Sequence, residues 1–378
     1  MVAKQSKKRF AVNKWNVKMQ NMMNRIFANQ KNKTVGRCNA SAAVFLSFML
    51  VFLTGCSEGK LPFAGLQELI GGKDILWEKT VMEETLCVEG LEGEYTLLFL
   101  TDTHVLTGQG ESEQEKQLYL ERSPQFVSKE GVLSKDQFGV WMDYANEKGV
   151  DAVILGGDII DVPTAENIAF LEEQLGKLNM PYLYANGNHD WTYPWEYMTE
   201  KAKEEHLPRF KNLMPQGNDF QVLELPGLTV VAVDNSSNQV TEASLQGFKE
   251  TLGIPLDNQV MLGESMQEPL PMIVVCHVPF MTQSVLGRAR EVWDTPVVLG
   301  AGNYGGIYPN EISQEFVNLM TAQASPVELV LAGHVHFYDN DVINGEKEVT
   351  QIVGGPGFLG EAVLLHIQGK QTKDTSNE

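Results

Sequence analysis

Five short apolar runs divide the chain, and each ends abruptly in Gly, Asn, Asp or His. The runs are Tyr95–Leu100, Ala152–Leu155, Tyr182–Ala185, Met272–Cys276 and Glu328–Leu331. Continuous apolar runs of this length are typical of strands that are buried on both faces of a sheet. The pattern therefore predicts five strands of a largely buried sheet.

Segments with apolar residues at helical spacing lie between these runs. They are Ser134–Lys148, Thr164–Leu178, Glu242–Leu252 and Asn310–Ala322. Thr164, with Glu166 and Asn167 in the turn that follows, is a typical start of a helix. The alternation of strands and helices predicts an α/β architecture. Near the C-terminus, Glu348–Val353 and Ala362–Ile367 read as strands with no helix between them, which predicts a second sheet or an antiparallel edge.

The charge of the chain is unevenly distributed. The formal net charge is −20, yet residues 1–55 hold ten Lys and Arg and no Asp or Glu, which leaves a balance of −30 in residues 56–378. Such a split indicates a targeting segment in front of an acidic domain. A hydrophobic content of 43% excludes a disordered polyelectrolyte, and four Cys exclude a disulfide scaffold. The acidic body also argues against nucleic acid as a partner.

The segment after the basic stretch, Ala42–Leu53, is apolar but shorter than the ~20 residues that a membrane-spanning helix needs. The sequence from Leu53 to Cys56 resembles the lipobox of bacterial lipoproteins. That resemblance implies that residues 1–55 are a signal peptide, that Cys56 is lipidated, and that the protein is extracytoplasmic and anchored to the bacterial cell membrane. The alternative is a plain N-terminal anchor helix. A true start at Met19, Met22 or Met23 would shorten the basic region.

The remaining boundaries follow from composition. Residues 56–75 are expected to form a tether, 76–370 the folded domain and 371–378 a polar tail. Cys87 and Cys276 read as strand residues, where buried Cys is common, so no disulfide is predicted. The sequence leaves the oligomeric state open.

Potential metal ligands follow all five strand runs directly. The segments are Thr101–His104, Gly156–Asp161, Asn186–Asp190, Cys276–His277 and Ala332–His336, and they hold five of the seven His. Sites in parallel α/β sheets form beyond the carboxyl ends of strands, so these segments are expected to converge. The D-x-H and H-x-H pairs are expected to project two side chains from one side of an extended backbone. Mixed carboxylate, amide and imidazole ligands suit two divalent ions of Mn, Fe or Zn.

The ordered set D-x-H, G-D-x-x-D, G-N-H-D, H and G-H-x-H resembles the calcineurin-like metallophosphoesterase family from Tyr95 to Ile367. The resemblance implies a sandwich of two mixed β-sheets flanked by helices. It also implies that Asp158 bridges two metal ions, that His189 donates a proton or stabilises phosphate charge, and that Asp190 orients His189. The other implied ligands are Asp102, His104 and His336 for one ion, and Asn188, His277 and His334 for the second.

Weaker signals surround this set. Asp161 is expected to support the site or cap a helix rather than bind metal. Trp191 either stacks against a substrate or anchors the next helix. Arg288 and Arg290 are candidate phosphate contacts or solvated side chains. The polar segment Val105–Lys135 is expected to be an insertion over the site or a lid, and Gly300–Gly305 a loop rather than a dinucleotide site.

The leading hypothesis is a binuclear metal-dependent phosphoesterase that attacks a phosphomonoester or phosphodiester with metal-bound hydroxide. The charge balance favours a small or membrane-borne phosphoester as substrate. Two alternatives stay open: hydrolysis of a pyrophosphate bond, and a non-catalytic surface lipoprotein that binds a phosphorylated ligand. The presence of His189 and Asp190 favours an enzyme, because a binding protein has no need of a proton donor.

Overall fold

The computed structural model describes residues 78–108, 110–254, 269–293 and 309–370, all within a compact unit that spans Trp77–Glu378. The predicted signal peptide, the lipidation site Cys56, the tether, the polar tail and the Gly300–Gly305 loop lie outside these residues. None of the helices in the described ranges combines the length and apolar character that crossing a membrane requires.

The first sheet has five strands in the order β1-β11-β2-β3-β4. Strands β2, β3 and β4 run parallel, whereas β11 pairs antiparallel with β2 and parallel with β1. The last strand of the described chain therefore lies between the first two. The strands are β1 (Thr80–Val88), β2 (Glu94–Leu100), β3 (Ala152–Leu155), β4 (Tyr182–Tyr184) and β11 (Glu361–Gly369).

The second sheet has six strands in the order β5-β6-β7-β8-β10-β9. Its centre is parallel from β6 to β10, and both of its edges pair antiparallel. The strands are β5 (Phe220–Leu225), β6 (Leu228–Val233), β7 (Met272–Val275), β8 (Val327–Ala332), β9 (Asp339–Ile343) and β10 (Val349–Val353).

The helices connect the strands along the chain, and in space they flank the two sheets. The α-helices are α4 (Glu113–Arg122), α5 (Ser134–Lys148), α6 (Ala165–Leu175), α7 (Asn188–Trp191), α8 (Glu200–His206), α9 (Glu242–Thr251), α10 (Gln283–Val292) and α11 (Glu311–Met320). Short 3-10 turns occupy η1 (Ser123–Gln125), η2 (Leu207–Phe210) and η3 (Gly357–Leu359). Side-chain caps begin several of these helices, and Thr164 accepts a hydrogen bond from the Asn167 backbone N–H at the start of α6.

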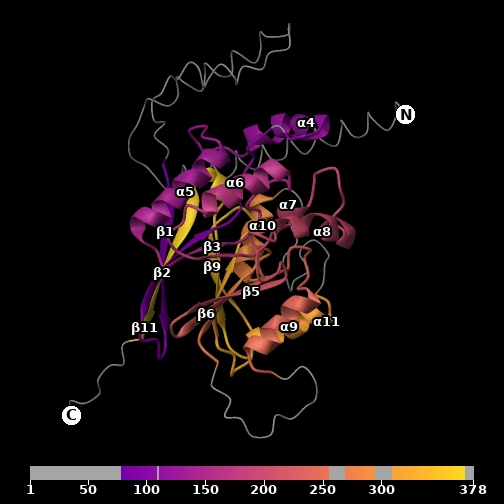
Figure 1. Cartoon of the computed structure of the whole chain (residues 1–378). Helices are drawn as coiled ribbons and strands as arrows, with labels where there is room; N and C mark the ends of the chain where they lie inside the picture. Colours follow the sequence, from indigo (N-terminus) through magenta and orange to yellow (C-terminus); the bar gives the residue numbers. More distant parts are fainter. Residues whose placement is uncertain (1–77, 109, 255–268, 294–308, 371–378) are drawn as a thin grey trace, which may run out of the picture. The chain divides into compact units, whose positions relative to one another are not determined.

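Three apolar clusters hold the layers together. One joins α5 and α6 to the outer face of the first sheet, a second fills the space between the two sheets, and a third joins α9 and α11 to the second sheet. Figure 1 shows α5 with α6 on one side of the domain and α9 with α11 on the other. The domain is thus a sandwich of two mixed sheets flanked by helices, as predicted.

Most expected elements are present within a few residues of their predicted bounds. Helix α5 matches Ser134–Lys148 residue for residue, and the five apolar runs are β2, β3, β4, β7 and β8. The late strands agree with the expectation of a second sheet, because β10 belongs to the second sheet and pairs antiparallel with its edge strand β9, while β11 belongs to the first sheet and follows the short turn η3. Cys276 is buried as expected, but Cys87 is exposed on β1, and both thiols are free.

Candidate metal centre

The segments that follow five strands meet at one place between the two sheets. The backbone N–H of His334, after β8 of the second sheet, donates to Asp102 Oδ2 after β2 of the first, at 2.9 Å. His277 Nδ1, after β7, lies 2.9 Å from the carbonyl oxygen of Gly156, after β3. Because these contacts join both sheets at the carboxyl ends of their parallel strands, the predicted convergence is present.

The side chains brought together there form two groups that are suited to metal ions. In the first, His336 Nε2 lies 3.3 Å from Asp102 Oδ1 and 3.2 Å from His104 Nε2. In the second, which also holds His334, His277 Nε2 lies 3.2 Å from Asp158 Oδ2. Within each group one ligand atom per residue lies within 4.8 Å of the others. Asp158 also forms a third group with His104 and His189, so it faces both sets, as a bridging carboxylate must.

Unpaired polar atoms show that these residues fit a cation. Asn188 Oδ1 is buried and forms no hydrogen bond with any described residue, and the buried His277 Nε2 has only its ion contact with Asp158 Oδ2. Buried polar atoms without partners are rare in folded proteins because they lose their hydration without compensation. A carbonyl oxygen and an imidazole nitrogen beside buried carboxylates are suitable ligands for Mn²⁺, Fe²⁺ or Zn²⁺.

The backbone at the predicted ligands is left-handed. Five of the six described non-glycine residues with positive φ are Asp102, His104, Asp158, His334 and His336, with φ from 44° to 71°. The prediction that the D-x-H and H-x-H pairs lie on extended backbone is therefore wrong. Each pair converges because its chain turns at both residues. Such conformations cost about 1–3 kcal/mol per residue and cluster at functional sites.

Glycines allow the ligand segments to approach one another. Gly157 has φ of +86°, and a Cβ there would lie 2.6 Å from His277 Nδ1 and 2.7 Å from the Gly187 backbone nitrogen. Any side chain at this position would push His277 out of the site. Only glycine fits here, because it has no Cβ and adopts positive φ without strain.

Burial and charge set the protonation of the imidazoles. Burial lowers the pKa of His104 to about 4 and that of His334 to about 3, so both are neutral and can bind metal through a free lone pair. Burial also opposes protonation of His277, but the Asp158 carboxylate outweighs it and raises the pKa of His277 to about 9. A cation bound by Asp158 and His277 would take the place of that proton.

Asp161 lies directly behind two histidine rings. Its Oδ1 is 3.1 Å from His104 Nδ1 and 3.1 Å from His189 Nδ1. Although burial opposes ionisation, the Arg122 guanidinium beside it holds the pKa of Asp161 well below its usual range. The ionised carboxylate accepts the Nδ1 proton of His104 and leaves its Nε2 directed at the predicted metal position, whereas the Nδ1 proton of His189 is hydrogen-bonded to the Asp161 backbone carbonyl oxygen at 3.1 Å, with the carboxylate beside it. This is the supporting position that the sequence indicated for Asp161.

Asp190 has a different role from the predicted one. Its carboxylate accepts five hydrogen bonds, at 2.7–3.1 Å: four from backbone N–H groups of Gly187 and residues 158–160, and one from the Tyr184 hydroxyl. The residue that contacts the His189 ring is Asp161, through its backbone carbonyl oxygen and its carboxylate. Burial and the nearby Asp158 raise the pKa of Asp190 to about 7. Asp190 therefore holds the ligand-bearing loops in place and does not position His189.

The comparison with known families agrees with this geometry. A model of the calcineurin-like phosphoesterase family matches residues 95–338, more than half of the chain. The chain belongs to the calcineurin-like phosphoesterase family. It is therefore a hydrolase of the metallophosphoesterase type.

Solved structures with a similar chain path are phosphatases and related hydrolases. A dimetal phosphatase from Danio rerio is 12% identical with a TM-score of 0.40, over 69% of this chain and 87% of the other. The purple acid phosphatase PPD1 from yellow lupin is 12% identical with a TM-score of 0.43, over 73% and 46%. The phosphopantetheinyl hydrolase from Mycobacterium tuberculosis is 14% identical with a TM-score of 0.34, over 71% and 92%. No curated protein sequence matches the chain.

The predicted substrate residues of this phosphoesterase have structural contacts of their own. Trp191 is 0% exposed and donates to Ser236 Oγ at 2.9 Å, so it anchors the core and has no face for a substrate. Arg288 is exposed on α10, donates to the Tyr338 carbonyl oxygen and lies over the Phe337 ring. Arg290 is exposed on the same helix. These positions correct the substrate-binding prediction for Trp191 and favour a structural role for Arg288.

Two supports of the phosphoesterase site were missed in the sequence. The first is Asn235, which follows β6, a strand not among the predicted ones. Its Oδ1 accepts from the backbone N–H groups of His277 and Val278 at 3.2 and 2.9 Å. The run Leu228–Val233 before Asp234 has the same apolar-then-polar signal as the five predicted runs. The second support is Arg122, which no local pattern indicates.

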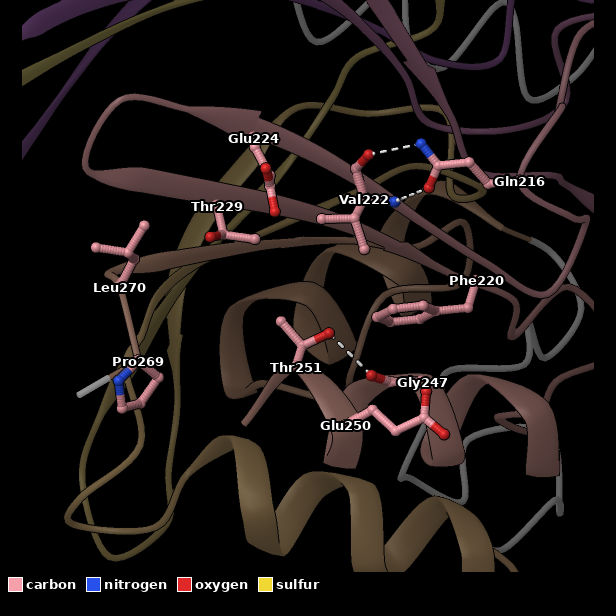
Figure 2. A pocket seen from close by; sticks show the side chains of 10 residues that line it. All are labelled: Gln216, Phe220, Val222, Glu224, Thr229, Gly247, Glu250, Thr251, Pro269 and Leu270. Atoms are coloured by element: carbon pink, nitrogen blue, oxygen red, sulfur yellow. Dashed lines mark hydrogen bonds between the residues drawn. The ribbon is translucent and has the colours of Figure 1, made fainter. Parts of the chain in front are cut away.

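A hollow of about 640 Å³ also lies on the surface between β5 and α9 (Figure 2). None of the predicted ligands lines it. Its described lining includes the carboxylates Glu224 and Glu250 and no Lys, Arg or His. Two carboxylates repel a phosphoester anion, so this hollow is not the substrate site of the phosphoesterase.

Proposed function

We propose that this hydrolase is a binuclear metal-dependent phosphoesterase that cleaves a phosphomonoester or phosphodiester. The observation that carries the proposal is the pair of ligand groups that meet at Asp158. Asp102, His104 and His336 would hold one divalent ion, and Asn188, His277 and His334 the other. When bound, two such ions lower the pKa of a water molecule and polarise the phosphoryl group, which is the chemistry of hydroxide attack on phosphorus.

The residues of the chain supply the rest of the reaction. The His189 backbone N–H donates to Asp158 Oδ1 at 2.7 Å. This hydrogen bond holds the proton donor next to the bridging ligand. Burial opposes protonation of His189, but Asp158 and Asp161 raise its pKa, which favours the protonated ring that a leaving group needs. This donor supports an enzyme over a receptor that only binds a phosphorylated ligand.

The test is hydrolysis of p-nitrophenyl phosphate and bis-p-nitrophenyl phosphate by the purified full-length protein, loaded in turn with Mn²⁺, Fe²⁺ or Zn²⁺. We expect activity with at least one ion and none after chelation. Asp158→Ala should abolish activity, and the control Asp143→Ala, at an exposed position on α5, should retain it. Activity that survives both Asp158→Ala and chelation contradicts the proposal. Cleavage of a nucleotide sugar into a nucleoside monophosphate and a sugar phosphate, without release of p-nitrophenol from either ester, would favour the pyrophosphate alternative.

We further propose that the phosphoesterase is a lipid-anchored extracytoplasmic protein that acts on a small or membrane-borne substrate. The support is the lipobox-like sequence that ends at Cys56 and the −30 balance of the chain after it, which repels polyanions. In cell fractionation, Cys56→Ala should move the protein from the membrane to the soluble fraction, with Cys38→Ala as the matched control. Unchanged membrane association of Cys56→Ala would contradict the lipid anchor.

A further inference from the structure

Helix α4 brings a buried arginine to the metal centre. The helix is polar, and Leu118 and Arg122, four residues apart on one face, are its buried positions. Arg122 is 5% exposed and binds Asp161 with two nitrogens: Nη2 lies 2.6 Å from Oδ1, and Nε donates to Oδ2. A two-pronged pair between a planar guanidinium and a carboxylate fixes the orientation of the carboxylate as well as its place.

The segment after α4 contacts the same histidine from another direction. The Phe126 ring stacks on His104 with centroids 4.4 Å apart and an interplanar angle of 7°. The Arg122 guanidinium carbon lies 5.2 Å from the centre of the Phe126 ring. His104 is therefore held by Asp161 at Nδ1 and by Phe126 on its face. Arg122 at the end of α4 holds Asp161, and Phe126 directly follows η1, so this part of Val105–Lys135 is packed against the site, as the insertion alternative expects.

We propose that Arg122 is a positioning residue of the metal centre. It fixes the Asp161 carboxylate between His104 and His189, and so sets one metal position and the proton donor through a single contact. The inference rests on the proposed binuclear function and assigns a role to a helix that lies outside the ligand motifs. Only the group of Asp102, His104 and His336 depends on this contact, because His277 and His334 do not touch Asp161.

The asymmetry between the two metal positions makes the role of Arg122 measurable. Loss of Arg122 leaves Asp161, which is 0% exposed, without its cation, so the carboxylate is free to turn and His104 loses its fixed orientation. Residues that orient a metal ligand typically change metal affinity by about 10- to 100-fold. We therefore expect about a tenfold or larger loss of affinity at one position and less than a twofold change at the other.

The experiment compares full-length wild type, Arg122→Ala, Arg122→Lys and Arg209→Ala by calorimetric titration of the metal-free protein with Mn²⁺. Arg209 is the matched control because it donates to the Pro163 carbonyl oxygen at 2.7 Å and has no contact with Asp161. We expect two binding events in all four proteins, with one weakened in both Arg122 variants. Guanidinium chloride at millimolar concentration should restore the weak event in Arg122→Ala, and Asp161→Asn should remove the effect of Arg122→Ala.

Three outcomes overturn the inference: unchanged Mn²⁺ affinities in Arg122→Ala, an equal loss at both positions, or the same losses in Arg209→Ala. If Arg122→Ala does not fold, Arg122→Lys keeps the charge and tests the loss of two-pronged geometry alone. The titration does not depend on turnover. A wild-type protein that binds two Mn²⁺ but hydrolyses no phosphoester would contradict the proposed function and leave the test of Arg122 intact.

Discussion

Replacing Asp190 with Asn should mainly lower the stability of the domain rather than act directly on catalysis. In the structure, Oδ1 of Asp190 accepts from the Ile159 and Ile160 N–H groups and from the Tyr184 hydroxyl, while Oδ2 accepts from the Asp158 and Gly187 N–H groups. The amide of Asn supplies a single acceptor oxygen, and its NH₂ group must face N–H donors. In the better of the two orientations, two buried N–H groups lose their partner.

The size of this effect follows from the free-energy cost of a buried N–H group that has lost its hydrogen-bond partner. Each unsatisfied buried N–H costs about 1–3 kcal/mol, so Asp190→Asn should lower the free energy of unfolding by about 2–6 kcal/mol. For a domain of this size the melting temperature falls by roughly 2 °C per kcal/mol, so a decrease of about 4–12 °C is expected. Metal affinity should fall as well, because the loop that carries Asp158 is held by these bonds.

The assay is thermal unfolding of the metal-free protein, followed by metal analysis after reloading. The matched control is Asp151→Asn, which alters an exposed carboxylate that accepts one backbone N–H, from Thr96, at 2.7 Å. Its melting temperature should stay within about 2 °C of wild type, because an exposed hydrogen bond contributes little. A normal melting temperature and two bound metals in Asp190→Asn, together with a large loss of kcat, would refute this reasoning and restore the role of orienting His189.

Three further predictions concern residues around the site. Iodoacetamide at pH 8 should modify the exposed Cys87 and spare Cys276, because burial raises the pKa of the Cys276 thiol to about 12 and leaves almost no thiolate. Peptide mass mapping measures the labelling, and equal labelling of the two thiols would contradict this prediction. Gly157→Ala should cost about 1–2 kcal/mol through its left-handed backbone alone and weaken one Mn²⁺ affinity, measured by unfolding and titration. Trp191→Ala should cost about 3–5 kcal/mol in unfolding experiments with unchanged KM, whereas a raised KM without destabilisation would indicate substrate contact.

The metal centre was predictable where its chemistry is local. A buried strand that ends in D-x-H or G-D-x-x-D carries its signal within a few residues, and parallel strands place such ends together. The same reasoning could have found Asn235, because Leu228–Val233 ends at Asp234 in the same way. The segment after Leu228–Val233 holds neither a histidine nor a G-D-x-x-D pattern, so it carries a weaker local signal than the other five.

The supports of the site were not predictable because they depend on contacts between distant parts of the chain. Arg122 and Asp161 are 39 positions apart, and no spacing rule joins the end of a polar helix to a carboxylate after a strand. The left-handed backbone at Asp102 and His104 was likewise hidden, since most non-glycine residues avoid that conformation and no side-chain pattern marks the exceptions. Tertiary packing decides both.

The place of β11 in the first sheet has a consequence for biosynthesis. This last strand of the described chain lies between β1 and β2 and pairs with both. The two earliest strands therefore cannot be joined in one sheet until residues 361–369 have left the ribosome. The sheet that presents Asp102 and Asp158 is therefore completed only after translation of the domain has almost ended. A premature stop a few codons before β11 removes an inner strand rather than a tail. We expect such a product to be degraded, even though it contains every ligand of the metal centre.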